Sequence, residues 1–265
     1  LEHNQLDLTT KNWLMSEFVN DEQQHMESPL SIVTGSKQQH QRQLQASKSA
    51  TGASAEGNIA LNGDVKPESP VDKLGASLKN ISNFGFNAID FTTDQLLNGV
   101  IFMLDDLHLI KHFGISKQKL RLFLDVLKVQ YQSNPYHNVT HALDVTQFVY
   151  CCLKCEKVHS LLSQIDMLSL MVAALAHDLD HPGLNNNYQV SAQTDLALRY
   201  NDNSVLENHH CATTFKILSD AKYNFLDALS IDDFKELRRN VISLILATDM
   251  SQHFELFAKF QTRIQ

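Results

Sequence analysis

Two short clusters of histidine and aspartate are the residues of this chain best suited to chemistry. The first is His137-Asn138-Val139-Thr140-His141-Ala142-Leu143-Asp144, and the second is His177-Asp178-Leu179-Asp180-His181-Pro182-Gly183. Imidazoles and carboxylates are the side chains with which proteins hold Zn²⁺, Mg²⁺ or Mn²⁺. A divalent ion held in this way activates water, so the two clusters predict a metal-dependent hydrolase.

The spacing within each cluster suits a helix. His137 and His141 are four residues apart, as are His177 and His181, so each pair would share one helix face at about 6 Å. Asp144 lies one turn beyond His141 and can accept a hydrogen bond from a ring N–H, which would fix the tautomer of a metal-binding histidine. A single pair at this spacing is more often a surface or packing pattern, and it is the presence of both clusters that favours a metal site.

Asp178 has a position suited to bridging two ions. It follows His177 directly, and its two oxygens can reach two metals roughly 3.5–4 Å apart. The residues before it, from Leu168 to Ala176, are almost entirely apolar, which predicts a buried helix. Buried imidazoles and carboxylates need partners, and a metal supplies them.

A third polar cluster has an open interpretation. Glu207 stands three residues after Ser204, so it either completes a capping box or orients metal-bound water. His209 and His210 are adjacent and point in different directions on a helix, so at most one of them faces the site. Cys151, Cys152 and Cys155 lie among apolar residues, which favours buried small side chains over a thiolate metal site.

The chain that positions these clusters is expected to be all-α. Ser116, Ser163, Ser204 and Ser230 occupy positions typical of helix N-caps, and no segment keeps the period-two alternation of a strand. The pattern is helical from about residue 86, with its clearest helices over about 117–131, 136–154, 165–181, 205–218, 231–248 and 250–264.

Composition separates the chain into two parts. Residues 1–82 are polar and rich in Ser, Gln, Gly and Ala, which predicts a disordered linker, whereas 83–265 form the folded part. The formal charge of −8 argues against a nucleic acid polymer as partner. The cysteines form no disulfide pattern and no apolar run is long enough for a transmembrane segment, so we expect a cytoplasmic protein.

From about Asn83 to Gln265 the chain resembles the catalytic domain of class I 3′,5′-cyclic nucleotide phosphodiesterases. The matching stretches are Tyr136 to Gln147, His177 to Gly183 with Asn186-Asn187, Tyr200-Asn201-Asp202 with Leu206 to His210, and Ala247 to Met250. The resemblance implies a multi-helix domain of the HD superfamily, incomplete in this chain. It also implies metal-dependent hydrolysis of cAMP or cGMP to the 5′-monophosphate, which ends cyclic nucleotide signalling.

The resemblance also implies a role for each matched residue. His141, His177 and Asp178 would be metal ligands, with Asp178 bridging a Zn²⁺ and a second ion, Mg²⁺ or Mn²⁺. His137 would be the proton donor to the leaving group, and Glu207 would hydrogen-bond metal-bound solvent. Residues that would support these groups or approach the nucleotide pocket are His181, Asn187, His210, Asp249 and Met250.

The choice between cAMP and cGMP is not readable from the motifs. The run from His177 to His210, especially Leu196 to Asp202, resembles the cGMP-selective branch most closely, and the chain also shares features with the calmodulin-regulated branch. The resemblance therefore favours cGMP. The family often forms homodimers. Two alternatives remain: another HD-type nucleotide phosphohydrolase, and a truncated, non-catalytic isoform that binds partners through residues 1–80.

The first prediction concerns residues 1–265 as a purified protein. In the family, a fourth metal-binding aspartate, a purine-binding glutamine and a stacking phenylalanine follow the region that matches this chain, so they would lie beyond Gln265. We therefore expect this protein to be poorly folded or inactive in a cyclic nucleotide hydrolysis assay. Clear turnover of cAMP or cGMP would contradict the expectation.

Overall fold

The structure is a computed structural model that describes residue 78 and residues 80–263. The expected linker over 1–82 lies mostly outside the described residues, so the boundary at 82 stays a prediction. Leu78 and Ile81 are already buried in the core. Within the described part of the chain, no helix is both long enough and apolar enough to cross a membrane.

All regular elements of the described residues are helices, as predicted. In chain order they are η2 (Ala88–Asp90), α3 (Thr93–Asp106), α4 (Leu109–His112), α5 (Lys117–Gln130), α6 (Val139–Lys154), α7 (Glu156–His159), α8 (Gln164–Ala176), α9 (Asn186–Ser191), α10 (Asp195–Tyr200), α11 (Val205–Leu218), α12 (Ile231–Leu246), η3 (Met250–Gln252) and α13 (His253–Arg263).

Three of the four predicted N-caps are confirmed. Ser116, Ser163 and Ser230 each accept a hydrogen bond from a backbone N–H in the first turn of the following helix. At Ser163 the full capping box with Asp166 is present. The predicted box at Ser204 is wrong, because this residue has a left-handed backbone (φ 38°) and makes no cap bond with its side chain.

Two helix boundaries differ from the expectation, and both place cluster residues in loops. α6 begins at Val139, after His137, because the Asn138 side chain accepts hydrogen bonds from two backbone N–H groups and caps the helix there. α8 ends at Ala176, with His177 as its C-cap. The histidine pairs at four-residue spacing therefore do not share a helix face.

Left-handed backbone conformations form the loop after α8. Asp180 has φ 61° and Gly183 has φ 81°, and neither value fits a right-handed helix. Turn hydrogen bonds from the Leu179 N–H to Ala176 and from the His181 N–H to Asp178 continue past the end of α8, and the chain leaves the helical path at Asp180.

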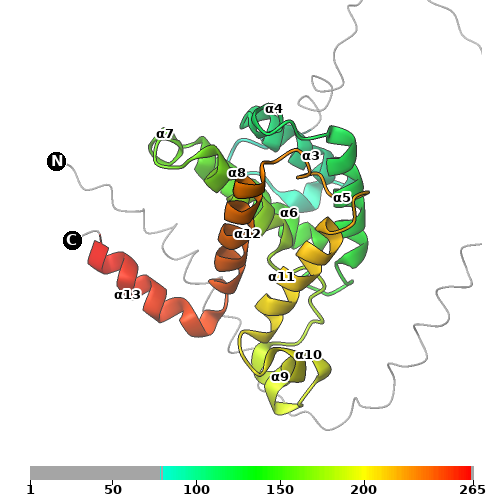
Figure 1. Ribbon diagram of the computed structural model, residues 1–265, viewed down its shortest axis with the longest axis vertical. Coiled ribbons are helices and arrows are strands. Elements are labelled where there is room, and N and C mark those ends of the chain that lie inside the picture. The colour runs from blue at the N-terminus through cyan, green and yellow to red at the C-terminus, as the bar shows by residue number, and fades with distance from the viewer. Residues whose placement is uncertain (1–77, 79, 264–265) are drawn as a thin grey trace, which may run out of the picture. The chain divides into compact units, whose positions relative to one another are not determined.

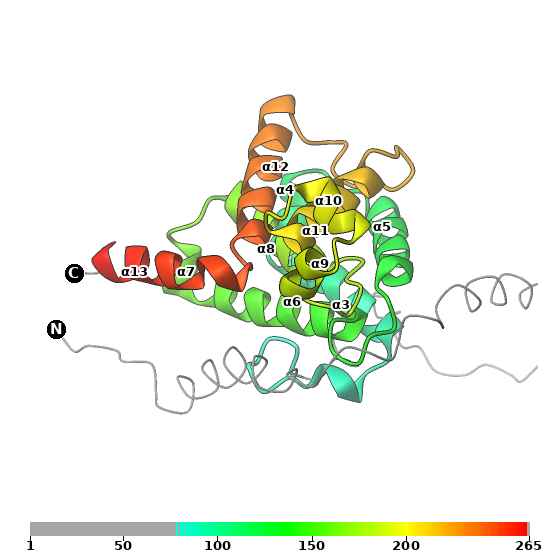
Figure 2. The same ribbon diagram turned by 90° about the horizontal axis from the view of Figure 1, so that it is seen from below.

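α8 is the central helix of the fold. It packs against α6 and α12 (Figure 1), and most of its side chains are buried on every side. α11 packs against α12 and also contacts α8 and α5 (Figure 2). In contrast, every described side chain of α13 is exposed. The two helix ends that carry the clusters, the start of α6 and the end of α8, are thus fixed by the core itself.

The second prediction concerns this core. Leu168→Ala in α8 removes a fully buried side chain, so we expect a loss of about 2–5 kcal/mol in the free energy of unfolding. Urea denaturation measures the change. The matched control is Leu161→Ala, which truncates a leucine that is 83% exposed and should cost less than about 0.5 kcal/mol. Equal losses in the two variants would argue against the central position of α8.

Candidate metal centre

Three side chains from the two clusters converge at the ends of α6 and α8. The Nε2 atoms of His141 and His177 are 3.3 Å apart. Asp178 Oδ2 lies 3.2 Å from His177 Nε2 and 3.5 Å from His141 Nε2. His141 stands in the first turn of α6, and His177 is the C-cap of α8. The fold thus joins the two clusters.

The geometry of these atoms fits a divalent cation. His177 Nδ1 donates to the carbonyl of Ala174 at 2.9 Å, so the ring carries a proton on Nδ1 and its Nε2, which faces the other two residues, is the atom that can bind a metal. One ligand atom from each of His141, His177 and Asp178 lies within 4.8 Å of the others. Two imidazole nitrogens and a carboxylate oxygen facing one point are a donor set for which a divalent metal is the natural partner.

The electrostatics of the site agree with this fit. Burial lowers the pKa of His141 to about 4 and that of His210 to about 3, so both rings are neutral near neutral pH. Burial would raise the pKa of Asp178, but His177 beside it outweighs that effect and holds the pKa well below its usual range. Although burial lowers the pKa of His177, Asp178 outweighs that effect and raises it. Neutral imidazole and ionised carboxylate are the states that bind metals, so His141 and Asp178 are in these states near neutral pH, and a cation would displace the Nε2 proton of His177.

A second group of possible ligands lies on the other side of Asp178. Asp178, His181 and His210 also bring ligand atoms within 4.8 Å of one another, and Asp178 Oδ1 lies 4.0 Å from His210 Nε2. However, His181 Nδ1 accepts a hydrogen bond from the Gly183 backbone N–H at 2.9 Å. The neutral His181 ring therefore carries its proton on Nε2, which makes that atom a donor and not a ligand.

His137 lies beside the convergent residues without joining them. Its ring stacks on the His181 ring with centroids 4.1 Å apart and planes 11° apart. The centroid of the His141 ring is 6.1 Å away. The predicted separation of the first histidine pair is therefore close to the observed one, although His137 lies in the loop before α6.

Glu207 is buried and is held by an amide side chain. Asn186 Nδ2 donates to both carboxylate oxygens of Glu207, at 2.9 and 3.2 Å, and Asn186 Oδ1 accepts from the backbone N–H of Leu206. Burial raises the pKa of Glu207. Of the two open interpretations, the capping box is excluded, since Ser204 makes no cap bond. Of the two asparagines in the matching stretch, Asn187 is exposed, whereas Asn186, for which no role was predicted individually, holds Glu207.

The remaining residues predicted for the site, Asp144, Asp249 and Met250, are not among the possible metal ligands. Asp144 is exposed on α6 and is not among the ligand groups within reach of one another. Asp249 is buried and accepts from Ser204 Oγ at 2.6 Å, which ties the start of η3 to the start of α11. Met250 is 45% exposed.

The structure adds a network that the sequence did not predict. Asp180 accepts hydrogen bonds from Gln132 Nε2 and His209 Nε2, both at 2.9 Å. It thereby joins the loop after α8 to the end of α5 and to α11. His209 thus faces Asp180 while His210 faces Asp178, as expected for adjacent positions on a helix. Asp180, which makes both contacts, has a left-handed backbone conformation, and no sequence motif predicts that conformation.

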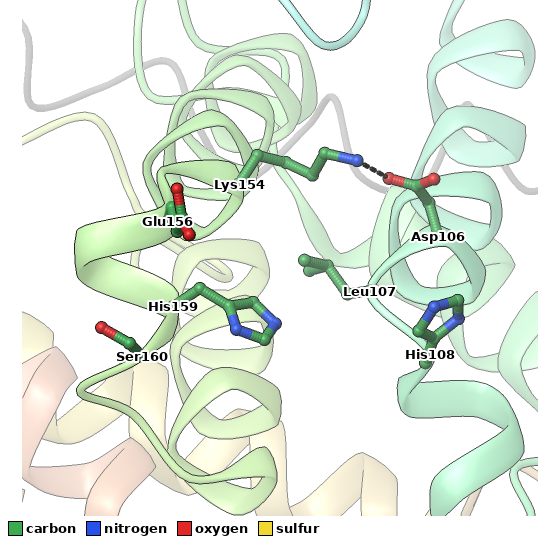
Figure 3. A pocket seen from close by; sticks show the side chains of 7 residues that line it. All are labelled: Asp106, Leu107, His108, Lys154, Glu156, His159 and Ser160. Carbon is green, nitrogen blue, oxygen red and sulfur yellow. Dashed lines mark hydrogen bonds and ion pairs between the residues drawn. The ribbon is translucent and has the colours of Figure 1, made fainter.

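A groove elsewhere on the domain is separate from this centre. It encloses about 370 Å³ and is lined by Asp106, Leu107, His108, Lys154, Glu156, His159 and Ser160 (Figure 3). Lys154 reaches across it to Asp106 at 2.7 Å. None of the residues predicted for the site lines this groove.

Comparison with known proteins decides the family. Residues 136–265 match the sequence model of the family described as 3'5'-cyclic nucleotide phosphodiesterase. The matched region belongs to the cyclic nucleotide phosphodiesterase family. It contains both histidine clusters, Glu207, Asp249 and Met250, so every residue predicted for the site lies within it.

Individual phosphodiesterases agree with this assignment. The "3',5'-cyclic-nucleotide phosphodiesterase regA" of Dictyostelium discoideum is 45% identical over 182 residues, which are 68% of this chain and 23% of that protein. The human "High affinity cGMP-specific 3',5'-cyclic phosphodiesterase 9A" is 42% identical over 172 residues, 65% of this chain and 29% of that protein. The chain thus spans less than a third of either relative.

A solved phosphodiesterase domain confirms the fold. The phosphodiesterase domain of the RhoPDE fusion protein from the choanoflagellate Salpingoeca rosetta superposes with a TM-score of 0.67 at 36% identity. The match covers 72% of this chain and 60% of that domain. The prediction of an all-α phosphodiesterase fold is confirmed.

The third prediction concerns metal binding. A divalent ion held by His141, His177 and Asp178 should stabilise the folded protein by about 2.7 kcal/mol when its concentration is 100-fold above Kd. We expect Mn²⁺ or Zn²⁺ to raise the Tm of the purified protein that contains this chain. The His177→Ala substitution should remove most of this rise in Tm. His159→Ala, at an exposed histidine of α7, is the matched control and should respond as the wild type does. Full stabilisation of His177→Ala would refute this ligand set.

Proposed function

We propose that the protein containing this chain hydrolyses 3′,5′-cyclic nucleotides to 5′-nucleoside monophosphates. The observation that carries the proposal is the convergence of His141, His177 and Asp178 next to His137, within a region that matches the phosphodiesterase family. The metal-binding donor set provides a place for the phosphate. The His137 imidazole beside it, which is not one of the ligands, provides a group that can move a proton.

The proposed cofactors are two divalent ions. His141, His177 and Asp178 Oδ2 would hold a Zn²⁺, because two imidazoles and a carboxylate suit that ion. Asp178 Oδ1 faces the opposite side, toward His210, and would hold a second ion, Mg²⁺ or Mn²⁺. Such ions, when bound, polarise a phosphate and lower the pKa of coordinated water.

The chain's own residues would divide the remaining work. His137 would donate a proton to the O3′ leaving group, a task for which histidine is the most frequent general acid in enzymes. Glu207 would accept a hydrogen bond from the attacking water, with its carboxylate held in place by Asn186. His181 would direct its Nε2–H toward the phosphate, because its Nδ1 is occupied by the Gly183 amide.

The substrate is proposed as cGMP, cAMP or both. One relative is named as cGMP-specific, whereas the other is named only for cyclic nucleotides. A cytoplasmic location is supported by four cysteines that are all free thiols. A homodimer remains a prediction.

The fourth prediction tests the activity. The purified, metal-loaded gene product should convert cGMP or cAMP to the 5′-monophosphate, measured by chromatography of the products. His137→Gln should lower kcat by about 10²–10⁴-fold, because the leaving alkoxide loses its proton donor. Bound metal, measured by elemental analysis, should not change in this variant.

The control is His159→Gln, which changes an exposed histidine of α7. It should keep the wild-type kcat. Metal-loaded protein that hydrolyses neither nucleotide would contradict the proposed function and would favour a non-catalytic role for the protein.

A further inference from the structure

One amide side chain bridges the two loops that carry the histidine clusters. Asn134 Nδ2 donates to the backbone carbonyl of His137 at 3.1 Å and to that of His181 at 2.7 Å. Asn134 lies between α5 and α6, whereas His181 lies in the loop after α8. A single NH₂ group thus uses both of its protons to join two segments that are distant in sequence.

The loop after α8 is built closely around this amide. Gly183 has φ 81°, and a Cβ atom added to it would lie 2.9 Å from Asn134 Oδ1. Any larger residue would therefore push against the asparagine. The backbone of Asn134 is held as well, because its carbonyl accepts from Asn138 Nδ2 at 3.0 Å. Both ends of the residue are fixed by contacts.

The two carbonyls that Asn134 binds belong to the two histidines whose rings stack. The His137 and His181 ring centroids are 4.1 Å apart and nearly parallel. His137 precedes α6, so the hydrogen bonds of that helix do not hold its backbone in place. Its position relative to His181 therefore depends on the ring stacking and on the loop contacts, and the shared Asn134 amide is what connects the two backbones.

We propose that Asn134 is a positioning residue for the proton donor: it fixes His137 against His181, and thereby fixes the distance of His137 from the metal ligands. This inference rests on the proposed function, in which His137 protonates the leaving group. The side chain must be an amide, because a carboxylate of the same shape has no N–H and would oppose both carbonyls.

The fifth prediction concerns Asn134→Asp, with Asn134→Ala as a second variant without the added charge. Displacing a proton donor by about 1 Å costs on the order of 10²-fold in rate, so we expect kcat for the cyclic nucleotide to fall by about 10–100-fold with KM little changed. For bis(4-nitrophenyl) phosphate the rate should fall less than about threefold, because nitrophenolate leaves without being protonated.

The matched control is Gln147→Glu. Gln147 Nε2 also donates to two backbone carbonyls, those of Ile81 and Asn83, at 2.7 and 3.0 Å, on another side of the domain. Its variant should lose a comparable amount of stability, seen as a lower Tm, and should leave the ratio of the two substrate rates unchanged. If Asn134→Asp and Gln147→Glu changed the ratio of the two substrate rates equally, Asn134 would be merely structural.

A second measurement does not depend on turnover. In ¹⁵N–¹H correlation spectra of histidine-labelled protein, ring signals of stacked His137 and His181 should move in the Asn134 variants. They should stay in place in Gln147→Glu. Unchanged His137 and His181 signals in both Asn134 variants would overturn the inference. This outcome does not depend on whether bis(4-nitrophenyl) phosphate is a substrate.

The failure of the inference and that of the proposed function have different signatures. If His137→Gln lowers the rates on both substrates equally, His137 is not a proton donor and the proposed function is wrong in that part. If His137→Gln selectively impairs the cyclic nucleotide while the Asn134 variants do not, only the positioning role fails.

Discussion

Asp178 carries a negative charge into the interior at the end of the most buried helix, and the loss of hydration there costs several kcal/mol unless it is compensated. Compensation starts with His177, whose Nε2 lies 3.2 Å from Asp178 Oδ2; the carboxylate outweighs the effect of burial and raises the pKa of this ring. His141 lies near the same oxygen and His210 near the other. Residues of α6 and α11 and the end of α8 thus meet at this carboxylate.

The residues around Asp178 are presented by helix ends and loops, and side-chain amides hold these segments in place. Asn138 caps α6, Asn186 joins the start of α9 to Glu207, and Asn134 joins the loop before α6 to the loop after α8. An amide both donates and accepts hydrogen bonds and carries no net charge, so it can link backbone segments near ionised groups without adding a charge to the site. The buried core of α8 supplies the rigid support for these links.

The helical fold and the main chemical groups could be predicted from the sequence, because both depend on local patterns. The apolar run before His177 identified α8, and Ser163 with Asp166 identified its start. Helix ends were predicted less well. The position of His137 outside α6 depends on a cap bond by Asn138, and the end of α8 depends on left-handed conformations that spacing does not encode.

The parts of the site that sequence reasoning missed are those set by tertiary contacts. The matching stretch contains two adjacent asparagines, and only the folded chain distinguishes Asn186, which reaches Glu207, from exposed Asn187. Glu207 resembled a member of a capping box because its spacing from Ser204 was right. The backbone of Ser204 is left-handed and its hydroxyl donates to Asp249, so the side chain does not cap α11.

The residue that follows Asn134 affects how the protein ages. Asparagine slowly loses its amide when the backbone nitrogen of the next residue attacks the side chain, and the cyclic imide that forms opens to isoaspartate or aspartate. Here the next residue is Pro135, whose ring nitrogen carries no hydrogen and cannot take part in that cyclisation. The amide that connects the two histidine loops is therefore protected from spontaneous deamidation by its own neighbour.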